Sequence, residues 1–295
     1  MICVELNGGL GNQMFQYACG RSLAYSHQTE LVLDLRRLKY NNKLFTSRAY
    51  ELEIFKISAR EINEEELRRL KSLTYRFFNT LHIKLFQKGI RTASYFVENT
   101  LSYDTKIELV SNNCYLSGYW QSPIYFQSIE KIIRDEFSFP SALNQSNRDL
   151  MDAIQSSNSV SLHIRRSDFV NNSNHSIHGV CSLEYYQKAI EIIANRVEHP
   201  VFFIFSDDIE WSRQNLPLSY NMTFVIGNSG QNSYIDMQLM SFCKNNIIAN
   251  SSFSWWGAWL NNSPNKIVVA PKIWFLKKEL NDQTKDLIPK SWIRI

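Results

Sequence analysis

Two adjacent arginines, Arg165 and Arg166, are the residues of this 295-residue chain best suited to binding a phosphate group. They lie in HIRRSD, from His163 to Asp168, directly after the apolar stretch SVSL, which is typical of a buried strand. Guanidinium groups present paired N–H donors that suit a pyrophosphate, and Asp168 can orient an arginine or bind a ligand hydroxyl. Surface ion pairing is the alternative. It is weakened because His163 and Arg165 share one side of the strand end and Arg166 points to the other.

A second polar cluster, FSDD from Phe205 to Asp208, also follows an apolar strand. A carboxylate at such a strand end commonly accepts hydrogen bonds from a ribose or a base, and the N–H donors of guanine would suit it. Capping of a helix that begins near Ile209 is an equally good interpretation. Since there are two carboxylates, Asp207 and Asp208 can divide these tasks between them.

The third cluster, NSSFSWWGAWL from Asn250 to Leu260, follows the strand NIIAN and opens a helix. Hydroxyl groups and backbone amides at a helix N-terminus form an anion site that needs no positive side chain. The residues concerned are Ser251, Ser252, Phe253 and Ser254. We interpret the tryptophans as core residues rather than sugar-binding platforms because they lie within the helix.

The fourth cluster is the glycine-rich stretch NGGLGNQMFQYA, from Asn7 to Ala18. Glycines after a first strand let the backbone approach a ligand closely, which makes Gly11 and Asn12 candidate contacts. The stretch lacks the third glycine of the dinucleotide fingerprint and the Lys-Ser/Thr pair of a phosphate-binding loop. A tight turn without a ligand is therefore an equally good interpretation.

The elements that must position these clusters alternate between strand and helix. A strand over residues 1–6, a helix over 13–27 and a strand over 30–34 form a βαβ unit. A strand is predicted over 114–120, and a helix follows Ser122-Pro123. The strands expected in the second half are 159–164, 201–205, 223–226, 246–249 and 266–270, with helices between them.

This pattern predicts an α/β protein with two Rossmann-like domains. The polar, turn-rich stretch PSALNQSN, from Pro140 to Asn147, marks the boundary, so the predicted domains are 1–142 and 143–295. The segment 75–87 is either an amphipathic packing helix or a face that meets a lipid-linked substrate.

Composition excludes several classes of protein. A hydrophobic fraction of 44% and a charged fraction of 20% are typical of a globular chain, and a net charge of +4 is too low for a nucleic-acid-binding stripe. Five scattered cysteines without CxxC spacing predict reduced thiols in the cytoplasm. No apolar run is long enough to cross a membrane. No Asp-x-Asp, GxSxG, kinase or zinc signature is present, so we predict no metal.

Together these motifs resemble those of the α-1,2-fucosyltransferases, most closely the bacterial cytoplasmic members. The resemblance spans nearly the whole chain and rests on NGGLGNQMFQYA, GYWQSP, HIRRSDF, FSDD and NSSFSWWGAWL. It implies the glycosyltransferase B architecture, with the acceptor held by domain 1–142 and GDP-fucose by domain 143–295. The implied reaction is metal-independent, inverting transfer of L-fucose to the 2-hydroxyl of a terminal galactose, in surface polysaccharide or O-antigen biosynthesis.

The resemblance also implies a role for each site residue. Arg165 contacts the β-phosphate, supported by Arg166 and Asp168, and Asn12 lies near the reacting sugar, with Gly11 allowing its approach. The other implied donor-binding residues are His163, Asp207, Asp208, Ser251, Ser252, Phe253 and Ser254. The core-fucosylating relatives carry a glutamate as base, where this chain has NNSNHS. That difference leaves His175 or His178 as the candidate base, or no strong base at all.

Two rival functions stay open: a glycosyltransferase that uses another GDP sugar, and a non-catalytic sugar-binding module. The sequence identifies neither the acceptor nor the oligomeric state. The family favours a galactoside acceptor, which can be lipid-linked. A lipid-linked acceptor would bring the protein into peripheral contact with the inner face of the cytoplasmic membrane.

Overall fold

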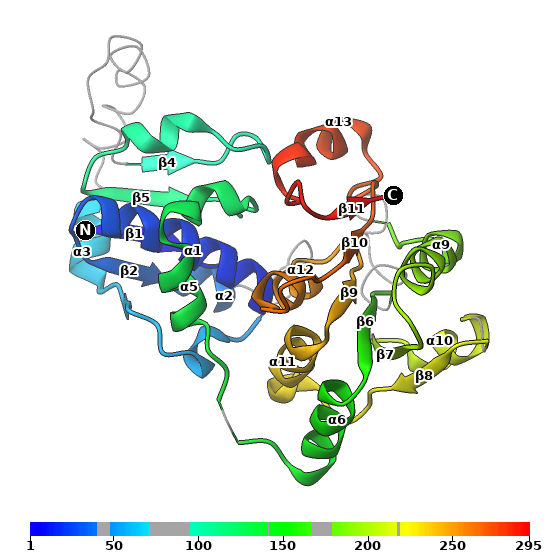
Figure 1. Cartoon of the computed structure of the whole chain (residues 1–295). Coiled ribbons are helices and arrows are strands. Elements are labelled where there is room, and N and C mark those ends of the chain that lie inside the picture. The colour runs from blue at the N-terminus through cyan, green and yellow to red at the C-terminus, as the bar shows by residue number, and fades with distance from the viewer. Residues whose placement is uncertain (40–47, 71–94, 141, 167–178, 217–218) are drawn as a thin grey trace. The chain divides into compact units, whose positions relative to one another are not determined.

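The computed structural model describes residues 1–39, 48–70, 95–140, 142–166, 179–216 and 219–295. The chain divides into two compact units, Met1–Ser138 and Phe139–Ile295. Each unit contains one parallel β-sheet with helices packed on it (Figure 1). Two Rossmann-like units in one chain are what the glycosyltransferase B architecture combines, so the predicted fold class is confirmed.

The first unit has a five-stranded sheet in the order β3-β2-β1-β5-β4. Its strands are β1 (Ile2–Glu5), β2 (Leu31–Asp34), β3 (Arg60–Glu61), β4 (Tyr95–Val97) and β5 (Cys114–Ser117). Its helices are α1 (Leu10–Ser26), α2 (Arg36–Lys39), η1 (Leu52–Ile54), α3 (Glu64–Leu70), η2 (Thr105–Leu109), η3 (Pro123–Ile129) and α5 (Glu130–Glu136). Helix α1 lies close to the sheet at Gly20, where an added Cβ would stand 2.2 Å from Cγ2 of Val4.

The second unit has a six-stranded sheet in the order β11-β10-β9-β6-β7-β8, the strand order of a dinucleotide-binding domain. Its strands are β6 (Asn158–Ile164), β7 (Pro200–Ser206), β8 (Asn221–Phe224), β9 (Asn245–Ile247), β10 (Val268–Ala270) and β11 (Ile293–Arg294). Its helices are α6 (Gln145–Gln155), α9 (Leu183–Ala194), α10 (Ile209–Asn215), η4 (Gly230–Asn232), α11 (Tyr234–Phe242), α12 (Ser252–Leu260), α13 (Lys278–Asn281) and η5 (Asp282–Asp286).

Helices cover both faces of this second sheet (Figure 1). Tyr186, Ile190 and Ile193 of α9 pack on one face, and Ile235 and Leu239 of α11 belong to the core on the other. Because both faces are covered, the central strands β6 and β7 are almost entirely buried, which explains their apolar sequences.

Several elements begin or end elsewhere than predicted. Helix α1 begins at Leu10 rather than residue 13, because Gly9 is its N-cap, so Gly11 and Asn12 lie in its first turn and not in a loop. Strand β5 ends at Ser117, since Trp120 has a φ of 55°, which no strand residue adopts. Phe242, whose place in the apolar pattern of α11 predicts an inward side chain, is 47% exposed.

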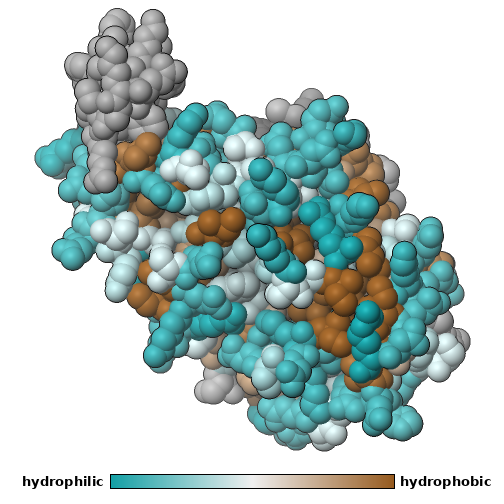
Figure 2. Space-filling model, turned by 45° about the horizontal axis from the view of Figure 1, so that its top comes forward, coloured by the Kyte–Doolittle hydropathy of each residue, from teal (hydrophilic) through white to brown (hydrophobic). Residues whose placement is uncertain are grey.

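The surface is mixed in character. Figure 2 shows hydrophobic patches separated by hydrophilic side chains on the face in view. Within the described ranges, no helix combines the length and the apolar character needed to cross a membrane. The segment 75–87, for which a lipid-facing helix was considered, lies outside the described residues.

Candidate active site

The strand order of the second sheet reverses between β6 and β9, which is its topological switch point. From there β7 and β8 follow on one side, and β10 and β11 follow on the other. In open parallel sheets, ligands bind outside the carboxyl ends of the strands at this point. The three strands that end there, β9, β6 and β7, are followed by Ser251, Arg165 and Asp207. The fold therefore brings three of the four predicted clusters to one edge of one sheet.

The two arginines are each paired with a carboxylate from the next strand end. Arg165 Nε lies 3.3 Å from Asp207 Oδ2, and Arg166 Nε lies 3.4 Å from Asp208 Oδ2. The Arg166 amide also donates to Asp207 Oδ1 at 2.8 Å, and its guanidinium carbon stands 3.9 Å from the centre of the Trp211 ring. Arg166 is thus fixed on two sides, while the side chain of Arg165 is 29% exposed at the edge.

Asp208 has a second structural task. It is the N-cap of α10, where its Oδ1 accepts a hydrogen bond of 3.1 Å from the Trp211 amide. This confirms the capping interpretation. Both carboxylates hold their neighbours in place, and whether either one also contacts a nucleotide stays a prediction.

His163, the last polar residue of β6, is buried beside the ring of Phe253 from α12, with ring centres 5.9 Å apart. Burial, together with the nearby charge of Arg165, lowers the pKa of His163 to about 3. Its Nδ1 atom has no hydrogen-bond partner among the described residues. A neutral imidazole in this position can accept a hydrogen bond from a ligand N–H group.

The entrance to α12 is formed by serines. Ser251 is the N-cap in an extended conformation, and its side chain makes no capping hydrogen bond to the described part of the helix. The buried Ser254 donates weakly to the Ser251 carbonyl at 3.4 Å. Because the first amides of a helix have no acceptor within it, the start at Ser252, Phe253 and Ser254 favours an anion. Trp255, Trp256 and Trp259 are buried, as predicted.

Asn250 secures the loop that leads into α12. Its Nδ2 donates to the carbonyls of Gly179 at 3.3 Å and Trp274 at 3.2 Å. Gly179 directly follows the segment 167–178, which contains Asp168, His175 and His178 and lies outside the described residues. The predicted roles of these three residues therefore stay predictions.

The fourth cluster lies in the first unit, at the switch point between β1 and β5. Asn12 Oδ1 accepts a hydrogen bond of 2.9 Å from Gln121 Nε2, in the loop after β5. Gly8 has a φ of 77°, and a Cβ there would stand 2.4 Å from Asn12 Nδ2, so this turn requires glycine. The tight turn at Gly8 therefore makes room for the Asn12 side chain, so the turn and a ligand-contacting role of Asn12 are compatible.

Sequence reasoning missed the two glutamines that hold this turn together. Gln13 Nε2 donates to the carbonyls of Gly8 and Ala49, both at 2.9 Å. Gln16 accepts from the Asn7 amide and donates to the Gly118 carbonyl, each at 3.0 Å. Both glutamines are fully buried, and a carboxamide within an apolar helical pattern is the signal that could have identified them.

A partly buried carboxylate in the second unit was also missed. Asp236, in the first turn of α11, accepts from Asn228 Nδ2 at 2.9 Å, and Asn228 pairs in turn with Asn147 of α6. Burial raises the pKa of Asp236 to about 7. Helix α11 begins at the same edge of the sheet as the arginines, because it follows the parallel strand β8. A partly buried carboxyl group with a raised pKa at this edge is a candidate site residue.

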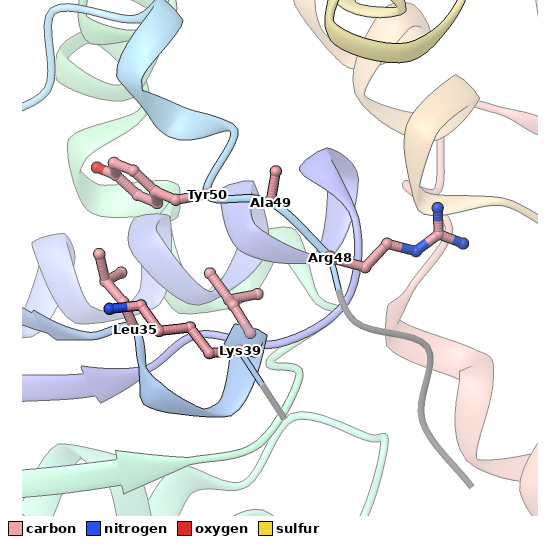
Figure 3. A pocket seen from close by; sticks show the side chains of 6 residues that line it. Leu35, Lys39, Arg48, Ala49 and Tyr50 are labelled. Atoms are coloured by element: carbon pink, nitrogen blue, oxygen red, sulfur yellow. The ribbon is translucent and has the colours of Figure 1, made fainter. Parts of the chain in front are cut away.

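A separate cavity of about 420 Å³ lies in the first unit. It is lined by Leu35, Leu38, Lys39, Arg48, Ala49 and Tyr50. Figure 3 shows Arg48 pointing away from the other labelled side chains. None of the predicted donor-binding residues lines this cavity.

The chain is similar to known glycosyltransferases along its whole length. It is 36% identical over 301 residues to an α-1,2-colitosyltransferase of Escherichia coli, covering 100% of this chain and 99% of that protein. It is also 36% identical over 306 residues to the O-antigen biosynthesis glycosyltransferase WbnK of Escherichia coli, covering 98% and 99%. A galactoside α-(1,2)-fucosyltransferase 1 of Plecturocebus brunneus is 27% identical over 154 residues, covering 49% of this chain and 42% of that protein. The model of glycosyl transferase family 11 matches residues 1–295, and the chain therefore belongs to this family.

Proposed function

We propose that the protein transfers L-fucose from GDP-β-L-fucose to the 2-hydroxyl of a terminal galactose, with inversion and without a metal ion. The observation that carries this proposal is the convergence of Arg165 and the serine entrance of α12 at the switch point of the second sheet. This edge offers fixed positive charge and helix amides at the place where such sheets bind nucleotides.

The proposed reaction places its largest charge change on the leaving group. The bond between the sugar C1 and the β-phosphate oxygen breaks, a new bond forms between C1 and the acceptor 2-oxygen, and the hydroxyl proton leaves. Negative charge collects on GDP as its bond breaks, so donors fixed at the diphosphate stabilise the transition state more than the ground state. In this proposal Arg165, whose guanidinium lies beside Asp207, serves this purpose.

The neighbouring residues have supporting roles in this proposal. Arg166 and Asp208 brace the loop that carries Arg165, and Asp168 supports the same contact. His163 is held neutral by its lowered pKa and accepts a hydrogen bond from the nucleotide. Asn12, oriented by Gln121 in the first unit, acts near the transferred sugar. His175 is the proposed proton acceptor.

Colitosyl transfer is the second candidate, because one full-length relative is an α-1,2-colitosyltransferase. Colitose is L-fucose without its 3-hydroxyl group, so the two donors differ by one hydrogen-bonding group. A site built to bind a hydroxyl rejects the analogue that lacks it far more strongly than an apolar site rejects the added hydroxyl. Donor preference therefore reports whether a polar group faces the 3-position.

The direct test is to incubate the protein with GDP-fucose, GDP-colitose or GDP-mannose and a panel of β-galactosides, followed by linkage analysis. We expect an α-1,2-linked fucosyl product. Transfer of colitose alone would replace fucose as the donor. Donor binding without transfer or hydrolysis would leave only a sugar-binding module. Testing free and lipid-linked galactosides, with and without anionic vesicles, examines the proposed acceptor and the peripheral membrane contact at the cytoplasmic face.

A further inference from the structure

The loop from Gly118 to Gln121, which follows β5 in the first unit, is hydrogen-bonded through its backbone to a single carboxylate. Glu98 lies directly after β4, and its two oxygens accept hydrogen bonds from the amides of Tyr119 at 2.7 Å and Trp120 at 2.9 Å. A carboxylate that accepts two backbone amides fixes the orientation of both peptide groups. Glu98 therefore sets the conformation of this loop.

Two further features show that the loop depends on close contact with Glu98. A Cβ at Gly118 would stand 2.4 Å from Cβ of Glu98, so only glycine permits the approach. Trp120 has a φ of 55°, a conformation that L-residues rarely adopt and that persists only where the surroundings impose it. The Trp120 amide is held by Glu98 on one side of this φ angle, and the Trp120 carbonyl accepts a hydrogen bond of 2.8 Å from the Ser122 amide on the other, so Glu98 supplies one part of the constraint.

The loop in turn holds the predicted reactive end of α1. Gln121 Nε2 donates to Asn12 Oδ1 at 2.9 Å, and the Gly118 carbonyl accepts from Gln16 of α1 at 3.0 Å. A displacement of the loop would thus be transmitted to Asn12. Glu98 is connected to Asn12 through hydrogen bonds that lie entirely within the first unit.

We propose that Glu98 is a positioning residue of the transfer reaction, which fixes the 118–121 loop so that Gln121 orients the Asn12 carboxamide. This inference rests on the proposed function, because it takes Asn12 to act near the transferred sugar. It assigns a role in catalysis to a carboxylate that belongs to none of the sequence motifs discussed above.

The ionisation of Glu98 makes the inference testable by pH. Burial raises the pKa of Glu98 to about 7. Among the described residues, the titratable groups that face it are Cys19 on α1, Tyr119 in the loop and Tyr125 on η3. Burial raises the pKa of each, so all three stay neutral between pH 5.5 and 8. Protonation of Glu98 puts a hydrogen on one of its oxygens, which weakens its capacity to accept both amides.

The first experiment compares turnover of the wild type and Glu98→Gln between pH 5.5 and 8. The glutamine offers one acceptor oxygen and one donor nitrogen, so it resembles the protonated acid at every pH. We expect kcat at pH 8 to fall about 10- to 100-fold, as small misplacements near reacting groups do. KM for the GDP sugar should change less than about threefold, since the nucleotide-binding groups lie in the other unit. The acid limb that we expect Glu98 to contribute in the wild type should be absent from the variant.

Three controls separate positioning from general damage. Glu130→Gln removes an exposed carboxylate of the same unit, which pairs with Arg134 on α5, and it should leave kcat and the pH profile unchanged. Gln121→Leu keeps Glu98 and its amides but breaks the link to Asn12, and it should lower kcat as Glu98→Gln does. His175 is itself the proposed proton acceptor and would contribute an acid limb of its own. The third control therefore measures residual turnover in a His175→Ala, His178→Ala background, where an acid limb near pH 7 should remain and Glu98→Gln should remove it. A pH-independent residual turnover in that background would overturn the assignment to Glu98.

Non-additivity tests whether Glu98 acts through Asn12. In an Asn12→Ala background, Glu98→Gln should lower kcat by less than about a further threefold, because the group being positioned is already missing. Full additivity, or an Asn12→Ala variant with wild-type turnover, would overturn the inference. The second result would also remove Asn12 from the proposed function.

Amide hydrogen exchange gives an answer that does not depend on the donor sugar. The amides of Tyr119 and Trp120 should be protected in the wild type above pH 7, less protected below it, and less protected at every pH in Glu98→Gln. If the two proteins show equal protection at every pH, the inference fails even if fucosyl transfer is established. If exchange follows the expectation but no GDP sugar is transferred, the loop is held as described and the proposed function fails, and with it the role in catalysis.

Discussion

At the scale of single residues, the arginine pair shows how one strand end divides two tasks. Arg166 is held by Asp208 and the Trp211 ring, whereas Arg165 has its guanidinium beside Asp207 at a partly exposed edge. The adjacent residues of a strand end point to opposite sides, so one can brace the structure while the other meets a ligand. This makes Arg165 the residue whose loss should affect chemistry with the least effect on folding.

We expect Arg165→Ala to lower kcat by at least about a hundredfold, since removing one donor from an anion-stabilising site typically costs about 2.7 to 4 kcal/mol. Arg165→Lys keeps the charge but loses the paired donors, so its kcat should lie between those of the alanine variant and the wild type. Arg213→Ala removes an arginine of α10 that lies over the Phe224 ring, away from the predicted contacts, and serves as the control. Turnover of Arg165→Ala within threefold of the wild type would contradict its role.

Replacement of Asp236 by asparagine should stabilise the folded protein and weaken donor binding. Its pKa is raised to about 7 in the folded protein, so the folded state holds the proton more tightly than the unfolded state does. Its contribution to stability is therefore full below the unfolded pKa and is lost as pH rises toward 7. Asp236→Asn avoids this loss, and its advantage over the wild type should grow by up to about 1.4 kcal/mol per pH unit between pH 5 and 7.

The measurement is urea unfolding at pH 5, 6 and 7.5, with GDP affinity determined in parallel by calorimetry. We expect the asparagine variant to be more stable at pH 7.5 and to bind GDP more weakly. Asp149→Asn, on the exposed surface of α6, is the matched control. If Asp236→Asn has the same pH dependence of stability as the wild type, the carboxyl group is not protonated in the way described.

At the scale of elements, two glycines allow helices to approach their neighbours closely. A Cβ at Gly257 of α12 would stand 2.9 Å from Cβ of Met240 on α11, and one at Gly20 of α1 would stand 2.2 Å from Cγ2 of Val4. Gly257 thus sets the distance between α11 and the helix that presents the serine entrance. It acts on the site through packing.

Gly257→Val should destabilise the protein by about 1 to 3 kcal/mol, as overpacking of a core does. It should also raise KM for the GDP sugar, because α12 is displaced together with Ser252 and its neighbours. Gly20→Val crowds the first unit in the same way, and we expect a comparable loss of stability with GDP affinity unchanged. Equal effects of the two variants on GDP affinity would mean that the position of α12 does not determine donor binding.

Hydrophobic pattern predicted the central strands and major helices well, because burial on both faces leaves long apolar runs such as those of β6 and β7. It missed β3, β4 and β11, which have two or three residues and lie at sheet edges. The two residues of β3, Arg60 and Glu61, are exposed, so no apolar periodicity marks them. The same limit applies to Glu98 and Asp236, whose importance depends on burial by residues distant in sequence.

At the scale of the whole molecule, the division of the chain into two parallel sheets separates two kinds of polar edge. The second unit has arginines and a helix entrance at its switch point, while the first has the bonded carboxamides of Asn12 and Gln121 together with the ion pair of Glu5 and Arg37. Positive charge suits a diphosphate, and neutral amides suit sugar hydroxyls. The roles predicted for the two halves, donor binding by 143–295 and acceptor binding by 1–142, follow this distribution and stay proposals.

If fixed charge performs the work of a metal ion, removal of divalent cations should not affect the enzyme. We expect turnover after dialysis against EDTA to stay within about twofold of the untreated protein, since arginine and helix amides, rather than a Lewis acid, stabilise the departing GDP. Arg165→Ala serves as the internal comparison, because a site that does not bind metal should not be rescued by Mg²⁺ or Mn²⁺. A loss of activity in EDTA that Mn²⁺ restores would show that an ion carries the charge assigned to Arg165. That ion would need protein ligands, and the proposed roles of the strand ends and of the helix entrance include no metal ligand.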